Sequence, residues 1–301
     1  MDESVAGVPC HALRPFVSSY IGYRQEGLPG RHRGLPSPYV TMIVTLDEPL
    51  LLAGPGVGND FRSDDLGADD LRAEDLRRND VRRYDALIAG LHTAPVHIVH
   101  HGRQAGIQLA LTPLGVRALV GVPAGSLASL NVHFEDVVGT SIHVVREKLL
   151  ATGSWSERFS ILDQWFGGIL DHEVAWRPEL AEAWRLIVGS GGRVPIERAA
   201  REVGWSPRHL RAQMVAETGF TPKTAARVAR FDRARHVLQQ RGNGTSLGRG
   251  PLALADLAAT HGYSDQAHLA REFRDFAGCP PSQWLAEEFP IVQASSAGAA
   301  S

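Results

Sequence analysis

Two short stretches place arginine, histidine and glutamine side chains between regularly spaced apolar residues. In residues 207–214 the polar side chains alternate with Leu210 and Met214, and residues 266–274 follow the same pattern. If each stretch is helical, the apolar residues share one side and the polar ones point away from it. Arginine and glutamine suit bidentate hydrogen bonds with flat groups such as purine edges. The outward positions hold Arg208, His209, Arg211 and Gln213 in the first stretch, and Gln266, His268 and Arg271 in the second.

Both stretches belong to a longer internal repeat. Aligning the chain with itself at an offset of about 58 residues, and about 59 after one extra residue in the second copy, superimposes two units near 195–219 and 253–278. Two copies in register are a stronger signal than one, which favours a repeated structural unit over an ordinary helical bundle. The matched positions are Ala199 with Leu257, Ala200 with Ala258, Gly204 with Gly262, Leu210 with Leu269, Met214 with Phe273 and Gly219 with Gly278.

Each unit has the composition of a helix-turn-helix. The small or apolar pairs that begin the alignment allow a close approach of two helices. Gly204 and Gly262 suit a turn whose backbone conformation is unfavourable for other residues. Ser206 and Asp265 are residue types that cap the start of the following helix. We therefore predict two helix-turn-helix units.

A basic helix is expected between the units, over residues 221–242, with Thr221 as its cap and Pro222 in its first turn. About 20 residues span roughly 30 Å, close to the ~34 Å of one DNA turn. Such a spacer would let two recognition helices enter adjacent major grooves, and basic side chains would lie near phosphates. A solvated helix face is the alternative explanation of the charge. The expected phosphate contacts are Lys223, Arg227, Arg230 and Arg274.

Charge divides the 301-residue chain unequally. Residues 1–171 hold 15 basic and 20 acidic residues, whereas residues 172–301 hold 16 and 13. A polyanionic partner is therefore expected for the second half only. Two cysteines fit a reducing compartment, and neither a secretory signal nor a membrane-spanning run is apparent. We expect a cytoplasmic protein of more than one domain.

The first half predicts a β-rich domain over residues 1–154, so the fold class is α+β. Runs at 39–46 and 50–53 are typical of strands, and runs at 95–102 and 105–113 indicate a hairpin around a Gly-Arg-Gln turn. Short strands with glycine and proline punctuation favour a small barrel or sandwich. Residues 30–38 are interpreted as a surface loop, with an arm that touches a ligand or the other domain as the alternative.

Three further segments complete the organisation. Residues 62–83 contain leucine or valine every five residues among acids, which fits a flexible insertion better than a solenoid. An amphipathic helix is expected over 155–171, packed on its own domain or used as a dimer interface or hinge. Residues 172–289 form the second domain, and the tail 290–301 is expected to be disordered.

The second half resembles the AraC/XylS family of bacterial transcription regulators. The resemblance covers about 172–289, and its most specific part is GYSDQAHLAREFRDFAGCPPSQW, from Gly262 to Trp284. It implies sequence-specific binding of double-stranded DNA, with Arg208, Arg211, Gln266, His268 and Arg271 as base readers. Ala212 stands where many members carry a basic residue, so the first half-site is expected to be read differently or more weakly.

The first half is similar to effector or dimerisation domains of the same family, which are often cupin-like β-barrels. The resemblance implies no enzyme activity, no catalytic residues and no cofactor. A small-molecule effector, a second copy of the chain and RNA polymerase are the further partners that it allows, with no membrane association.

An alternative function is a metal-binding cupin-type sensor or enzyme fused to the DNA-binding module. Six histidines in the β-rich half make it conceivable, but no matching carboxylates accompany them, so we expect no bound metal. The cysteine cluster of a DNA-repair alkyltransferase is also missing. The histidines are His92, His97, His100, His101, His133 and His143.

Overall fold

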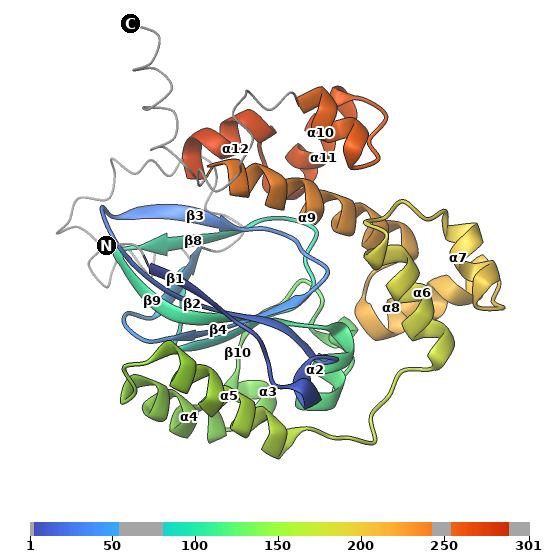
Figure 1. Cartoon of the computed structure of the whole chain (residues 1–301). Helices are drawn as coiled ribbons and strands as arrows, with labels where there is room; N and C mark the ends of the chain where they lie inside the picture. The colour runs from blue at the N-terminus through green and yellow to red at the C-terminus, as the bar shows by residue number, and fades with distance from the viewer. Residues whose placement is uncertain (1–2, 54–80, 243–253, 289–301) are drawn as a thin grey trace, which may run out of the picture.

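The computed structural model describes residues 3–53, 81–242 and 254–288. A β-rich half and a helical half follow one another along the chain (Figure 1). The expected insertion at 62–83 lies mostly outside the described residues, although its last three residues begin a strand; the expected tail lies wholly outside them. No helix of the described ranges is both long and apolar enough to cross a membrane.

The larger of two antiparallel sheets has six strands in the order β1-β2-β9-β4-β7-β10. Its longest pair joins β2 to β9, with Tyr20 opposite Leu109 and Arg24 opposite Ala105. The strands are β1 (Glu3–Gly7), β2 (Val17–Glu26), β4 (Val40–Thr45), β7 (Ala86–Ala89), β9 (Arg103–Leu111) and β10 (Asn131–His133).

The smaller sheet has the order β3-β8-β5-β6. Its strands are β3 (Gly30–Gly34), β5 (Leu50–Ala53), β6 (Val81–Tyr84) and β8 (Val96–His100). The predicted hairpin is wrong, because β8 and β9 belong to different sheets. Gly102 between them has φ +97°, and its carbonyl accepts a hydrogen bond from Gly27 N, so the chain turns a corner into the other sheet. The loop expected at residues 30–38 is also wrong for β3.

The first half is therefore an α+β domain in which two sheets face each other, and the hydrogen bonds between the described strands do not join them into one closed barrel. Ile43 and Leu87 of the larger sheet pack with Leu52 and Ile98 of the smaller one. The other face of the larger sheet carries helices. These are α2 (Pro113–Val120), α3 (Glu135–Val138), α4 (Ser141–Leu150) and α5 (Trp155–Ile169).

Helix α5 packs within its own domain. Trp155 and Phe159 lie over Gly22 of β2 and Gly7 of β1, where a β-carbon would come within 2.3 and 2.5 Å of the rings. The Asp163 carboxylate accepts a hydrogen bond from the Tyr20 hydroxyl at 2.8 Å. The buried side of this helix is therefore used inside the chain.

The second half is entirely helical in its described residues. The bounds are α6 (Pro178–Gly189), α7 (Ile196–Glu202), α8 (Pro207–Thr218), α9 (Pro222–Gly242), α10 (Leu254–Thr260), α11 (Gln266–Ala277) and α12 (Pro281–Glu288). Sequence reasoning did not single out α12, although Pro281 in its first turn is a start signal. One hydrophobic cluster runs from the helices on the larger sheet into this half.

Candidate nucleic-acid interface

The first helix-turn-helix consists of α7 and α8. Ala199 and Ala200 of α7 are fully buried, which allows α8 to approach closely. Gly204 has φ +71° in the turn, and the Ser206 hydroxyl accepts a hydrogen bond from His209 N at 3.2 Å. The predicted turn and cap are therefore confirmed.

The second unit, α10 and α11, repeats this construction. Leu257 and Ala258 are buried, and Gly262 has φ +77°. The Asp265 carboxylate accepts a hydrogen bond from His268 N at 2.7 Å, and this bond lowers the pKa of Asp265. A capping carboxylate at a helix N-terminus stays charged, and its negative charge interacts favourably with the positive end of the helix dipole.

The apolar positions of α8 and α11 face the core as predicted. Leu210, Met214, Leu269 and Phe273 have no exposed surface. Ala267 of α11, whose spacing from Leu269 and Phe273 also suggested a core position, is instead exposed. The polar positions differ among themselves. Those that are exposed to solvent are Arg208, His209, Arg211, Gln266 and Arg271.

Gln213 and His268 are partly buried rather than fully outward. The His268 ring lies 5.2 Å from that of Tyr263, and its Nε2 lies 4.0 Å from Glu272 Oε1. In the first unit, His209 packs 4.7 Å from Trp205 in the same manner. Each histidine thus rests on the aromatic residue of its own turn, which limits how far it can reach toward a ligand.

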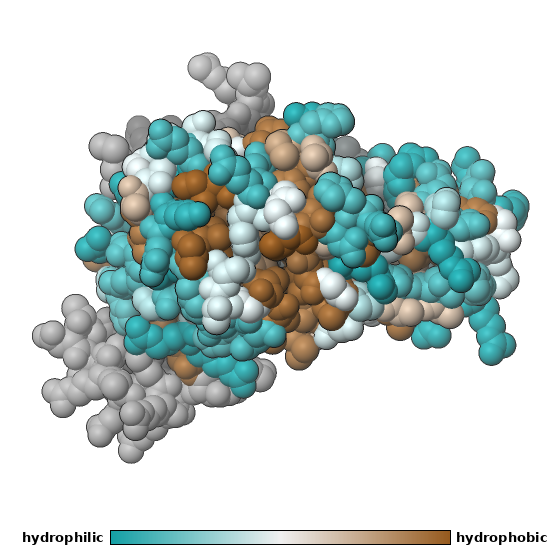
Figure 2. All heavy atoms as spheres, turned by 90° about the horizontal axis from the view of Figure 1, so that it is seen from below, coloured by the Kyte–Doolittle hydropathy of each residue, from teal (hydrophilic) through white to brown (hydrophobic). Residues whose placement is uncertain are grey.

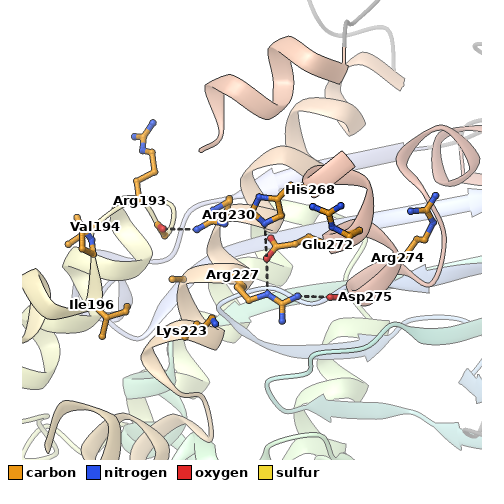
Figure 3. Close-up of a pocket in the computed structure, with 14 residues that line it drawn as sticks. Arg193, Val194, Ile196, Lys223, Arg227, Arg230, His268, Glu272, Arg274 and Asp275 are labelled. Atoms are coloured by element: carbon orange, nitrogen blue, oxygen red, sulfur yellow. Dashed lines mark hydrogen bonds and ion pairs between the residues drawn. The ribbon is translucent and has the colours of Figure 1, made fainter. Parts of the chain in front are cut away.

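A cleft of about 740 Å³ lies between the two units (Figure 3). Lys223 of α9, Arg271 and Arg274 of α11, and Arg193 in the loop before α7 contribute cationic side chains to its lining. All four are exposed. An anionic chain that contacts both units would meet these cations first.

Two of the residues expected at phosphates make contacts inside the protein. Arg227 pairs with Glu272 and Asp275, and Arg230 donates a hydrogen bond to the Gly192 carbonyl. Lys223 and Arg274 form no ion pair with any described residue. Sequence reasoning missed Arg193 and Glu272. Nothing in the local pattern marked either of them. Arg193 lies in a loop, where its Nε donates to the Ser190 carbonyl, and the ion-pair partner of Glu272, Arg227, is 45 residues away in the chain.

The β-rich half contacts both recognition helices at their C-terminal ends. Near Gly219, which ends α8, the backbone approaches Gly125 so closely that a β-carbon on Gly125 would lie 2.9 Å from Gly219 N. Gly278, which ends α11, faces Pro95. The exposed polar residues stand at the opposite ends. In helix-turn-helix proteins the N-terminal residues of the recognition helix contact base edges. Because the β-rich half contacts only the C-terminal ends of α8 and α11, their N-terminal ends stay accessible.

Two ion pairs add to these contacts. The Arg117 guanidinium donates two hydrogen bonds to Glu217 of α8, at 2.9 and 2.7 Å. Arg33 of β3 reaches Glu287 at 2.5 Å and Glu288 at 3.1 Å, both on α12. Residues 30–34 therefore contact the helical domain, which agrees with the alternative interpretation of residues 30–38 as an arm that touches a ligand or the other domain.

The histidines of the β-rich half are dispersed. His133 packs 4.6 Å from Tyr84, His143 pairs with Glu135, and His100 lies 5.8 Å from His32. Over 3–53, 81–242 and 254–288, no three His, Cys, Asp or Glu side chains are arranged to hold a metal ion.

Comparison with known proteins adds a family match for part of the chain. Residues 199–287 match the model of a family described as a helix-turn-helix domain. No curated protein matches the chain.

The solved structures that resemble it include two from different bacteria. A transcriptional regulator from Chromobacterium violaceum, described as an AraC-type DNA-binding domain-containing protein, is 23% identical over 36% of this chain and 90% of its own, with a TM-score of 0.31. ToxT from Vibrio cholerae, solved with an unsaturated fatty acid bound, is 8% identical over 89% of this chain and 95% of its own, with a TM-score of 0.51. The likeness to ToxT concerns the fold and extends over both halves.

Proposed function

We propose that residues 199–287, which match a helix-turn-helix family model, form an AraC-type DNA-binding domain, and that the chain regulates transcription by reading two adjacent major grooves of duplex DNA. The observation that carries the proposal is the matched geometry of α8 and α11. Both helices begin at a side-chain cap, expose arginine near that end and end at a glycine against the β-rich half. Recognition helices read bases with these N-terminal residues.

Base contacts are assigned to Arg208, His209, Arg211 and Gln213 of α8 and to Gln266, His268 and Arg271 of α11. Arginine suits guanine and glutamine suits adenine in the major groove. The two histidines and Gln213 have less reach, because they are partly buried or rest on an aromatic ring. We therefore expect the exposed arginines to contribute most of the sequence discrimination.

Phosphate contacts are assigned first to Lys223 and Arg274, which line the cleft between the units and are exposed. Cations at this position would neutralise the sugar-phosphate backbone between the two grooves. Arg227 and Arg230, which the sequence also pointed to, make contacts within the protein and supply less charge to the DNA.

Selection of bound sequences from random duplex DNA tests this function. The full-length chain should enrich two half-sites about one helical turn apart, and a footprint should protect both. Enrichment of a single half-site, or of no sequence, would contradict the proposal.

For the β-rich half we propose a role in effector binding, in dimerisation or in both, with its two sheets as an open form of the cupin-like arrangement. The printed description of the ToxT structure, with an unsaturated fatty acid bound, makes a fatty acid the first compound to test. Thermal unfolding of the full chain with and without oleate would show binding as a concentration-dependent rise in Tm.

For dimerisation, the face of α4 and α5 is the candidate surface. Val144 and Leu150 of α4 are 54% and 44% exposed. Figure 2, which views the molecule from the side of these helices, shows hydrophobic surface gathered in the middle of this face. A shift from dimer to monomer in Val144→Glu, measured by sedimentation, would locate the interface there.

A further inference from the structure

Arg227 of α9 lies against the inner side of the second recognition helix. Its Nε donates to Glu272 Oε1 at 2.7 Å, and an Nη donates to Asp275 at 2.6 Å (Figure 3). Its guanidinium carbon lies 4.9 Å from the ring centre of Phe276. Burial is the largest single effect and opposes its charge, but the hydrogen bonds and charges of Glu272 and Asp275 together outweigh burial and raise the pKa of Arg227. One cation thus contacts three residues along a single side of α11.

Glu272 is a charged group in an unusual position, since it is only 4% exposed. Its other oxygen, Oε2, has no hydrogen-bond partner within the part of the chain that the structure describes. The Tyr263 hydroxyl is buried nearby, and burial first, then the Glu272 carboxylate, raise the pKa of Tyr263. A buried carboxylate is costly unless a cation compensates it, so α11 is held where Arg227 can reach it.

Arg230, one helical turn further along α9, joins the two units to each other. It donates to the Gly192 carbonyl at 3.1 Å, in the loop that leads to the first unit. Its guanidinium also lies 5.4 Å from the ring centre of Tyr263, in the turn of the second unit. The same loop is pressed onto α9, since a β-carbon on Gly192 would lie 1.9 Å from the Ala226 carbonyl oxygen.

We propose that Arg227 and Arg230 are positioning residues that fix the second recognition helix relative to the first, and so determine which half-site spacing the protein accepts. The inference rests on the proposed function and adds a spacing specificity to it. A rigid connecting helix alone fixes only a distance. The azimuth and tilt of α11 depend on the side-chain contacts that seat it on α9.

The competing explanation is that the same arginines contact DNA phosphates directly. A substitution of Glu272 distinguishes the two explanations. If Arg227 contacted DNA, removing the neighbouring carboxylate charge would strengthen binding at every spacing. If Arg227 positions α11, the same change loosens the helix and weakens the preference for one spacing. Glu272→Gln keeps the size of the side chain, removes its charge and replaces one acceptor oxygen by an NH2 group.

The experiment measures affinity for the selected DNA with half-sites at the optimal spacing and moved by one or two base pairs, over a range of salt concentrations. The wild type should lose about tenfold in affinity per displaced base pair, as for a lost base contact. Glu272→Gln, Arg227→Gln and Arg230→Gln should reduce this preference to about threefold or less, with the salt dependence nearly unchanged.

Lys223→Gln is the matched control on the same helix. It should keep the tenfold spacing preference and lower the slope of log K against log salt by about 1. Arg227→Lys should fall between wild type and Arg227→Gln, because an ammonium group cannot contact two carboxylates through a planar fork. This conservative variant keeps the test valid if Glu272→Gln does not fold.

The inference is overturned if Glu272→Gln tightens binding at all spacings, or if Arg227→Gln lowers the salt slope while keeping the spacing preference. A wild-type chain that selects no sequence would instead defeat the proposed function itself.

Discussion

Arg208 and Arg271 occupy the exposed N-terminal halves of α8 and α11, and their removal should affect different half-sites. Replacing Arg271 by alanine should weaken specific binding by about 1–3 kcal/mol and relax the base preference in the second half-site only. Arg208→Ala should do the same in the first half-site. Binding to DNA with each half-site mutated in turn measures this. Equal losses at both half-sites would contradict the assignment.

His32 makes the stability of the β-rich half depend on pH. Burial, and then His100, lower the pKa of His32 to about 4. A histidine in the unfolded chain titrates near 6.5, so the unfolded state binds more protons between pH 4 and 6.5. The stability that neutral His32 contributes is therefore present above pH 6.5 and is lost as the pH falls toward 4.

Between pH 7 and 5 the wild type should lose about 2 kcal/mol more free energy of unfolding than His32→Asn. Urea unfolding at the two pH values measures the difference. His97 and His100 also have lowered pKa values, so part of the pH dependence should remain in the variant. Identical pH profiles for the two proteins would refute the role of His32.

The turns of the helix-turn-helix units require glycine for conformational reasons. Gly204 has φ +71°, and a β-carbon there would have no neighbour within 4 Å. Gly204→Ala should therefore destabilise the protein by about 1–2 kcal/mol through backbone strain alone. Gly167, inside α5, has equally open space and a helical backbone, so Gly167→Ala should instead stabilise by about 0.5–1 kcal/mol. Chemical denaturation of both variants provides the comparison.

The elements that the sequence predicted well are those with local signals. Ser206, Asp265, Gly219 and Gly278 mark helix starts and ends by residue type, and the structure uses them so. Strand β3 was taken for a loop because its alternation of glycine, arginine and histidine is not apolar. Its partner β8 lies more than 60 residues away in sequence, and pairing at that distance leaves no local pattern.

The contrast between local signals and contacts distant in sequence also explains which parts of the site were predictable. The exposed arginines follow from helical periodicity, whereas the partners of Arg227 do not, since Glu272 and Asp275 are 45 and 48 residues away. The sequence therefore suggested that all the arginines of α9 could bind a ligand, whereas Arg227 and Arg230 already make contacts within the protein. Periodicity shows which side of a helix is polar and gives no information about which polar groups are already paired.

For the whole molecule, two ion pairs between the halves should contribute unequally. The Arg33 side chain is 8% exposed and meets two glutamates, whereas Arg117 and Glu217 are 31% and 21% exposed. Arg33→Ala leaves the largely buried Glu288 carboxylate uncompensated and should cost about 3 kcal/mol, against about 1 kcal/mol or less for Arg117→Ala. Differential scanning calorimetry should show the halves unfolding separately in Arg33→Ala. A single unshifted transition would contradict this prediction.

The backbone contact between Gly125 and the end of α8 has a mechanical consequence. An α-helix resists compression along its axis, and the 12 residues of α8 extend for roughly 18 Å. A shift of the segment at Gly125 that moved Gly219 would therefore also move Arg208 at the other end of α8. If Arg208 contacts DNA as proposed, such a movement would change how deeply its guanidinium enters the groove, so the position of residue 125 would affect DNA binding through α8.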